Sequence, residues 1–299
     1  LYVGSGSPLS NVGTLTNQGI ELEVGYKLSV DKVNLSFLAN ASYVKNEIKN
    51  LGNQTGYIDK ESLPTLGTVS RNQNGYPIGY FFGYKAIGVF QTQEEIDNYI
   101  SPATGKPIQP NAVPGDTKFE DLNGDGVISD DNEDRTMIGK PNPDWMVGLT
   151  VAADWNGFDL SAFFQGSFGA DVFDALRRYE LAAVNYTSDA LERRTGPGTS
   201  NSMPRIVLGD TPKNFRPSTL LVHDASFLRL RNLQVGYTLP AQLTRKAYIQ
   251  RLRFYASFDN LLTITGYKGM DPEIGSTMGI DKGVYPQARV YTFGLNLTF

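Results

Sequence analysis

Residues 121–128, Asp-Leu-Asn-Gly-Asp-Gly-Val-Ile, have the types and spacing of the first part of a calcium-binding loop of the EF-hand type. Carboxylate, amide and backbone carbonyl oxygens recur at every second position, and Gly126 allows the sharp turn that such a loop needs. The candidate ligands in this stretch are Asp121, Asn123, Asp125 and Val127, the last through its carbonyl. Hard oxygen ligands at this spacing predict one Ca²⁺ ion.

The residue that completes the ligand set is ambiguous. An EF-hand loop ends on a bidentate Glu at position 12, and here Asn132 stands at that position. Four nearby carboxylates offer replacements: Asp130, Asp131, Glu133 and Asp134. Asp134 takes the role if the loop carries two extra residues. No amphipathic helices flank the loop, which favours a structural ion over a calcium sensor.

Charge around the loop supports the same interpretation. Eight acidic residues lie between Asp116 and Asp134, and the only basic residues beside them in the sequence are Lys118 and Arg135. A divalent cation would relieve their mutual repulsion. The alternative is an acidic, solvated turn of Asp, Asn and Gly that binds no metal.

Catalytic motifs are absent from the sequence. The single histidine, His223, has no nucleophile elbow or phosphate-binding loop to accompany it, so we expect no enzyme activity. The formal net charge of -4 and the sequence pI near 5.2 exclude a strongly basic nucleic-acid binder, and no nucleic-acid partner is expected. With no cysteine, thiolate chemistry and disulfides are excluded as well.

Aromatic and arginine side chains between the predicted strands are candidates for ligand contact, because rings stack on sugars and guanidinium groups bind hydroxyls or carboxylates. For any single one of them, packing of the loops against each other is the favoured role. These candidates are Tyr76, Tyr80, Phe81, Tyr84, Arg177, Arg178, Tyr179, Tyr186, Arg193 and Arg194.

Seven stretches alternate apolar and polar residues with a period of two, which predicts β-strands. In the last of them the apolar face carries Tyr291, Phe293, Leu295, Leu297 and Phe299. In one strand the phase changes, which predicts a β-bulge near Arg231 and Asn232. The predicted strands are Gly19–Ser29, a strand from Val33 to Tyr43, Met146–Trp155, Phe158–Ser167, Phe227–Leu239, Arg251–Asn260 and Val290–Phe299.

Connections between these strands alternate strictly in length. The short ones are 30–32, 156–157 and 240–250, and the long ones are 48–144, 168–225 and 261–289. Short turns at one end and long loops at the other are typical of outer-membrane barrels, whose strands face lipid on one side. No run of roughly 18 apolar residues predicts a membrane helix. We therefore predict an all-β, antiparallel transmembrane β-barrel with long extracellular loops.

Seven strands cannot close an ordinary antiparallel barrel, since the first and last would run parallel. The sequence starts at Leu1, with neither an initiator methionine nor the pattern of a signal peptide. The sequence thus predicts a segment of a larger barrel, with further strands before Leu1. Residues 76–90 offer another strand, although their prolines and glycines favour a packed loop.

Several stretches, in this order, resemble the C-terminal part of the SusC/RagA-like TonB-dependent transporters of Bacteroidota. They are 17–22, 75–84, the segment DLNGDGVISDDNEDRTMIGKPNPDW, 227–233, 236–240, 254–261 and the terminal Phe299. The resemblance implies a 22-stranded barrel with an N-terminal plug, both largely before Leu1. It also implies a SusD-like lipoprotein over the extracellular loops and energy from the TonB–ExbB–ExbD complex. In this family an Asp precedes Arg-Thr at the end of the calcium loop, and here that residue is Asp134.

The sequence therefore predicts that residues 1–299 are the C-terminal strands and extracellular loops of one barrel domain, with the calcium loop inside connection 48–144 and no plug. The expected function is import of oligosaccharides, or of peptides, across the outer membrane. Two alternatives remain open: a siderophore or cobalamin receptor without the lipoprotein, and a secreted, calcium-stabilised, glycan-binding β-sandwich.

Overall fold

The dominant element is a seven-stranded, fully antiparallel sheet whose strands follow chain order. The computed structural model describes residues 13–177, 185–274 and 278–299. All seven predicted strands are present, although several extend further toward the long connections than predicted. They are β1 (Thr14–Val30), β2 (Val33–Asn50), β11 (Trp145–Trp155), β12 (Phe158–Phe168), β15 (Phe227–Thr238), β16 (Arg251–Thr265) and β18 (Val290–Thr298).

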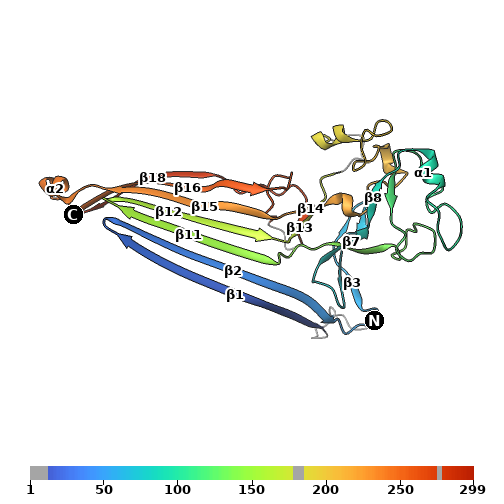
Figure 1. The fold of residues 1–299 in the computed structure, drawn as a ribbon, viewed down its shortest axis with the longest axis horizontal. Coiled ribbons are helices and arrows are strands. Elements are labelled where there is room, and N and C mark those ends of the chain that lie inside the picture. The colour runs from blue at the N-terminus through green and yellow to red at the C-terminus, as the bar shows by residue number, and fades with distance from the viewer. Residues whose placement is uncertain (1–12, 178–184, 275–277) are drawn as a thin grey trace, which may run out of the picture.

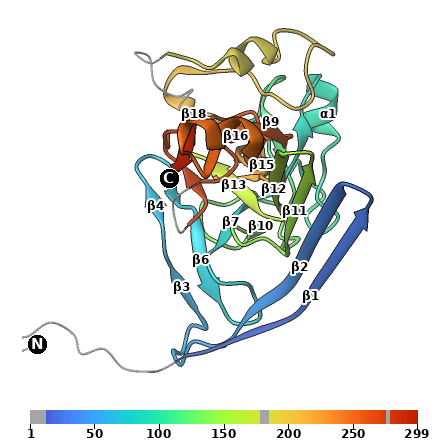
Figure 2. The ribbon, with the colours of Figure 1, turned by 90° about the vertical axis from the view of Figure 1, so that its left-hand side faces the viewer.

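Short connections join these strands at one end of the sheet, and the long connections gather at the other (Figure 1). Asn156 and Gly157 both have positive φ values, 47° and 87°, as the predicted Asn-Gly hairpin requires. The third short connection forms α2 (Ala241–Thr244) and the 3₁₀ turn η4 (Arg245–Ala247). Viewed from the end with the short turns, the sheet follows an arc whose edge strands, β1 and β18, lie apart (Figure 2).

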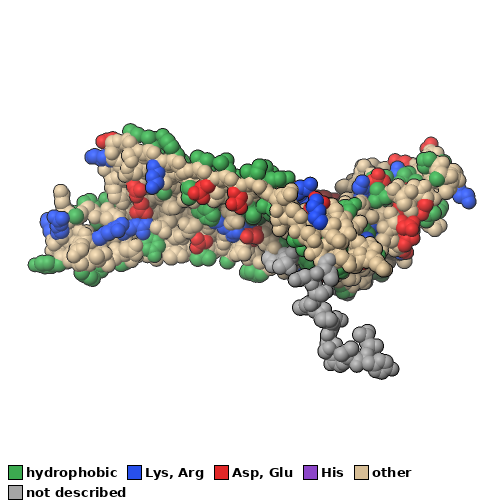
Figure 3. All heavy atoms as spheres, turned by 90° about the horizontal axis from the view of Figure 1, so that it is seen from below, with side chains coloured by type: hydrophobic (Ala, Val, Ile, Leu, Met, Phe, Trp, Pro, Cys, Tyr) green, Lys and Arg blue, Asp and Glu red, His purple; other side chains and the backbone are tan. Residues whose placement is uncertain are grey.

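The two faces of the sheet differ in polarity, as the alternation predicts. On the apolar face, Ile20, Leu22 and Val24 of β1 are more than half exposed. Ring pairs lie near both ends of this face: Tyr43 with Trp145, and Phe158 with Tyr237. In the strand half of the molecule, basic and acidic side chains follow the strands, and hydrophobic side chains gather along a margin (Figure 3). No helix in the described part of the chain is long and apolar enough to cross a membrane.

A β-bulge interrupts the centre of the sheet where the sequence predicted it. Asn232 and Leu230 pair with the adjacent residues Phe163 and Phe164 of β12, so Arg231 is an extra residue. On the other side, β16 adds a residue of its own at Asn260, which has a φ of 52°. The bulge confirms the predicted phase change and leaves Arg231 on the polar face beside Arg229.

The three long connections, 51–144, 169–226 and 266–289, fold together into one unit, which we call the loop domain. Its strands form four small sheets. They are β3 (Tyr57–Asp59), β4 (Ser62–Leu63), β5 (Gly67–Thr68), β6 (Ser70–Gln73), β7 (Tyr80–Tyr84), β8 (Ala86–Val89), β9 (Thr117–Phe119), β10 (Arg135–Gly139), β13 (Asp171–Asp174), β14 (Val222–Asp224) and β17 (Ile280–Asp281). Its helical turns are α1 (Gln93–Asp97), η1 (Ser188–Glu192), η2 (Leu208–Asp210) and η3 (Thr219–Leu221).

Residues from all three long connections share one hydrophobic core in the loop domain. Its buried members are Leu63, Val69, Phe81, Phe173, Leu221 and Ile280. In addition, β13 and β17 pair in parallel and so join the second connection to the third. Residues 76–90 contribute β7 and β8 to this domain, not an eighth strand to the large sheet. Each connection therefore buries some of its apolar residues against the other two.

Candidate functional site

The predicted calcium loop is a series of side chains that accept hydrogen bonds from their own backbone. Asp121 accepts from Gly124 N–H and Gly126 N–H, both at 2.8 Å. Asn123 accepts from Asp125 N–H at 3.0 Å, and Asp125 accepts from Val127 N–H at 2.8 Å. The three side-chain ligands that the sequence predicted are thus brought together in one tight turn.

Among the candidates for the last ligand, Asp134 has the most suitable position. It is completely buried and accepts from the N–H groups of Leu122 and Ser129, both at 3.1 Å, across the mouth of the loop. Asp130 instead turns outward to form an ion pair with Lys213. These contacts favour Asp134 over Asp130 as the residue that closes the loop.

The donor chemistry of the loop suits calcium, but its carboxylates alone do not form a metal-binding cluster. Within the described ranges, no three Asp, Glu, His or Cys side chains are placed to hold a metal ion together. The oxygens of Asp121 and Asp134 are occupied by backbone N–H groups. Calcium binding, with Asp121, Asn123, Asp125, Val127 and Asp134 as ligands, therefore remains a prediction.

The charge argument made from the sequence needs a correction. Lys118 and Arg135 are not the only basic residues near these acids, because basic residues distant in the sequence form ion pairs with several of them. Asp116 pairs with Arg205 at 2.6 Å, and Glu120 with Lys85 at 3.3 Å. These pairs form because the long connections fold against one another, which the local sequence could not indicate. Repulsion among the acids is therefore weaker than expected.

Saturating Ca²⁺ should raise the melting temperature of the loop domain in the full-length protein. Free ligand at 100 times its Kd contributes about 2.7 kcal/mol to the folded state. Asp125→Asn keeps the side-chain shape and removes one charge, so it should weaken calcium binding by about tenfold or more. Calorimetric titration with CaCl₂ measures the calcium affinity, with Glu94→Gln in α1 as the control variant. Identical calcium responses of Asp125→Asn and the unmodified protein would contradict the prediction.

Most of the aromatic ligand candidates pack inside the loop domain. Tyr80, Phe81 and Tyr84 are at most 4% exposed. The Tyr84 hydroxyl donates to the carbonyl of Ser129 at 2.8 Å, and burial raises the pKa of that hydroxyl. Tyr76 stacks on Tyr80 with ring centroids 4.9 Å apart. Packing is therefore the role of the three buried rings.

The arginine candidates are engaged as well. Arg177 pairs with Asp174 at 2.9 Å and with Asp189 at 2.5 Å. Arg193 and Arg194 donate to the carbonyls of Ala190 and Gln91. The candidates Arg178 and Tyr179 lie outside the described residues, and Tyr186 is 45% exposed.

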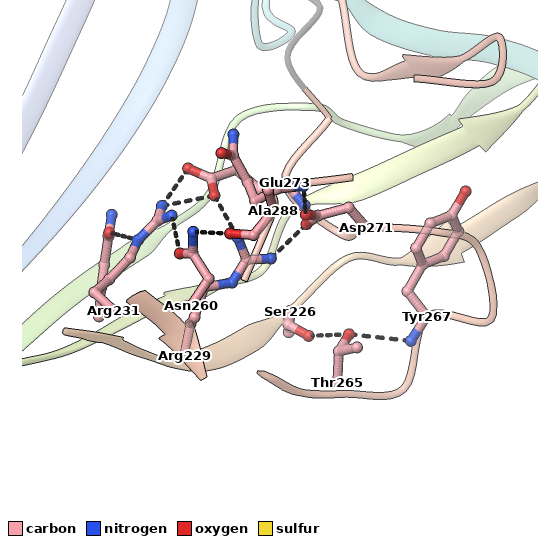
Figure 4. Close-up of polar contacts among 11 residues, drawn as sticks. Ser226, Arg229, Arg231, Asn260, Thr265, Tyr267, Asp271, Glu273 and Ala288 are labelled. Atoms are coloured by element: carbon pink, nitrogen blue, oxygen red, sulfur yellow. Dashed lines mark hydrogen bonds and ion pairs between the residues drawn. The ribbon is translucent and has the colours of Figure 1, made fainter. Parts of the chain in front are cut away.

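A group of arginines on the polar face was not anticipated from the sequence (Figure 4). Arg229 is 2% exposed and pairs with Asp271 at 2.5 Å and Glu273 at 3.1 Å. Arg231, the bulge residue, binds both carboxylate oxygens of Glu273, at 2.5 and 2.6 Å. The two arginines of β15 therefore hold the start of connection 266–289 against the sheet.

The far end of the same connection is attached by hydrogen bonds. Asn260 donates to the carbonyl of Ala288 at 2.9 Å (Figure 4), and Asp271 accepts from Gln287 N–H at 2.9 Å. We call the group formed by Arg229, Arg231, Asn260, Asp271 and Glu273 the wall clamp. Two arginines flanking a predicted bulge were its only sequence signal, because their acidic partners lie some 40 residues away.

Comparison with known proteins identifies relatives of this chain, although no family model matches it. It is 32% identical to TonB-dependent receptor P3 of Formosa agariphila over 314 residues, which is all of this chain and 30% of the receptor. It is 30% identical to TonB-dependent receptor SusC of Bacteroides thetaiotaomicron, over 97% of this chain and 27% of SusC. The solved RagAB peptide transporter superposes with a TM-score of 0.74 at 26% identity, covering 97% of this chain.

The chain belongs to the SusC/RagA-like TonB-dependent receptors. It spans about 30% of the length of the curated relatives that it matches. The seven-stranded sheet is accordingly a segment of the antiparallel transmembrane β-barrel of these receptors, as the sequence predicted. A β-sandwich, the alternative considered from the sequence, is wrong, because the chain superposes over 97% of its length on the RagAB transporter.

Proposed function

We propose that the chain is part of a TonB-dependent importer that carries oligosaccharides across the outer membrane together with a SusD-like lipoprotein. The observation that carries this proposal is the arrangement of the sheet and loops. One polar and one apolar face run the length of the strands, and the long connections form a single packed domain at one end. Membership of the TonB-dependent receptors supports import in the same way.

In this proposal the apolar face meets outer-membrane lipid and the polar face lines the lumen. The loop domain lies outside the cell and faces the lipoprotein. Residues 1–299 would then be the C-terminal strands and extracellular loops of the barrel, and the plug that contacts TonB–ExbB–ExbD would lie elsewhere in the protein. Cargo is trapped between lipoprotein and loops, and it enters when TonB moves the plug.

The chain's own residues shape the passage. The wall clamp fixes connection 266–289 at the lumen wall, and so it sets how far this connection reaches into the passage. The shared core of the loop domain holds the other two connections in a fixed relation to it. Cargo specificity would follow from these fixed surfaces, since no catalytic group is needed for transport.

Peptides are the second candidate cargo, because the solved relative is described as a peptide importer. A siderophore or cobalamin receptor is a further alternative, and it would act without a lipoprotein. Purification of the full-length protein from native outer membranes distinguishes these possibilities. We expect a lipoprotein subunit to co-purify, and a deletion strain to lose growth on defined oligosaccharides. Growth that is unchanged on every oligosaccharide and peptide tested would contradict import of these cargoes.

A further inference from the structure

Two adjoining hollows lie in the loop domain, with volumes of about 700 and 540 Å³. Lys213 and Arg216 line both hollows, so these two side chains form a basic ridge between them. Concave sites of this size are typical of small ligands, whereas protein partners usually meet flatter surfaces. Two further cations line one hollow each: Lys106 the larger and Arg135 the smaller.

Arg216 is held rigidly in the ridge. Its guanidinium lies over the rings of Tyr84 and Phe119, 4.7 and 4.9 Å from their centroids. Its Nε donates to the carbonyl of Lys213 at 3.1 Å, and its buried Nη1 lies 3.9 Å from a carboxylate oxygen of Asp130. An arginine fixed in this way loses little side-chain entropy when it binds an oxyanion.

The acids that line the hollows are already occupied. Asp116 is buried and bound by Arg205, and Asp210 accepts from the N–H groups of Asn214 and Phe215. Asp130 faces both residues of the ridge, through an ion pair with Lys213 in which both side chains are at least half exposed, and through a longer contact of 3.9 Å with Arg216 Nη1. An exposed pair of this kind contributes little and is easily exchanged for another carboxylate.

The uncharged lining of the larger hollow combines aliphatic side chains with the polar side chains of Thr104, Gln109, Asn111 and Thr211. Pro107, Ile108, Pro110, Val127 and Pro212 line the larger hollow, and none of its lining residues is aromatic. Sugar recognition by ring stacking is therefore not the chemistry that this hollow offers. It offers charge and apolar contact.

From this geometry we infer that the Lys213–Arg216 ridge binds a carboxylate group of the cargo. A ligand carboxylate would replace Asp130 at Lys213 and at the Arg216 guanidinium, which Asp130 approaches to 3.9 Å. The inference deepens the proposed function, because it assigns an acidic class of cargo to the loop domain. Acidic oligosaccharides and acidic peptides share this chemistry, and the experiment must separate them.

Titration calorimetry on the full-length protein in detergent tests the site with three probes: hexagalacturonate, hexaglutamate and neutral maltohexaose. We expect at least one acidic probe to bind, with an affinity that falls as the NaCl concentration rises from about 50 to about 300 mM. Lys213→Glu should weaken this binding by about tenfold or more, since it replaces attraction with repulsion. The acidic probe that binds identifies the source of the carboxylate.

Lys268→Glu is the matched control, because Lys268 is 70% exposed in the loop domain and lines neither hollow. It should leave the affinity within about twofold. Arg216→Lys keeps the charge but loses the planar fork, so intermediate weakening is expected. The inference is overturned if no acidic probe binds, if maltohexaose binds equally well, or if Lys213→Glu binds like the unmodified protein. Import is measured separately, so an importer of neutral cargo disproves only the site.

Discussion

Replacing Arg229 by alanine should release connection 266–289 from the barrel wall. Arg229 is almost completely buried, and its removal leaves Asp271 without the cation that balances its charge. Breaking a buried ion pair on one side typically costs about 3–5 kcal/mol. Hydrogen exchange of the amides in residues 268–288 should therefore accelerate by about two to three orders of magnitude. Mass spectrometry of the full-length protein measures this exchange, region by region.

Arg251→Ala is the control for this experiment, because Arg251 lies at the other end of the sheet and is exposed. Its effect on exchange in residues 268–288 should be negligible. Unchanged protection of this region in Arg229→Ala would contradict a stabilising role for the wall clamp. Accelerated exchange throughout the barrel would indicate general unfolding instead, and would equally contradict a local clamp.

The same clamp has an expected pH dependence. Burial alone would raise the pKa of Asp271, but hydrogen bonds from Gln287 N–H and Glu273 N–H and the Arg229 guanidinium lower it below its ordinary value of 3.8. A carboxylate with a lowered folded-state pKa stabilises above its unfolded pKa, and this contribution disappears as the pH falls through the folded value. Protection of connection 266–289 at the clamp should thus persist down to about pH 5 and decline only below about pH 4.

Asp116→Ala should loosen the loop domain without unfolding the barrel wall. The Asp116 carboxylate is 3% exposed and accepts from Arg205 at 2.6 Å and Asn214 at 3.1 Å. It thereby ties connection 51–144 to connection 169–226. Its loss leaves Asn214 without one acceptor and Arg205 without its carboxylate, and because Arg205 is one-third exposed and can be hydrated, the expected cost is about 1.5–3 kcal/mol. Limited proteolysis should show new cleavages in residues 85–120 and 200–217, with the strands still protected.

Glu120→Ala is the matched control for Asp116→Ala. Glu120 also forms an ion pair, with Lys85, but both side chains are more than 40% exposed. Exposed pairs contribute about 0–1 kcal/mol, so this variant should be digested like the unmodified protein. Equal digestion of Asp116→Ala and Glu120→Ala would show that the buried carboxylate does not hold the two connections together.

Local patterns sufficed for the strands. Each strand contacts its neighbours along its whole length. One face of the strand meets apolar surroundings and the other meets polar surroundings, so apolar and polar residues must alternate in the sequence itself. The hairpin at Asn156 and Gly157 and the bulge at Arg231 were predictable for the same reason, because turn chemistry and phase are local. Their positions in the structure agree with these predictions.

Contacts within the loop domain were not predictable in this way. Phe81 and Ile280 belong to one core although 199 residues separate them, and Tyr80 and Tyr84, candidates for ligand contact, are buried near it. The sequence of such an irregular segment shows no hydrophobic periodicity, and its apolar residues pack against residues of other connections. The alternating lengths of the connections predicted where the loops lie, but not that they would fold as one unit.

By itself, then, the sequence determined the seven strands, their inward and outward faces and the acidic loop around Asp121, because these depend on neighbours in the chain. Tertiary structure alone decided which charges meet: Arg229 with Asp271, Asp116 with Arg205, and Lys213 with Asp130. The physical reason is that ion pairs form wherever folding brings opposite charges within a few ångströms, and a sequence records no such distance.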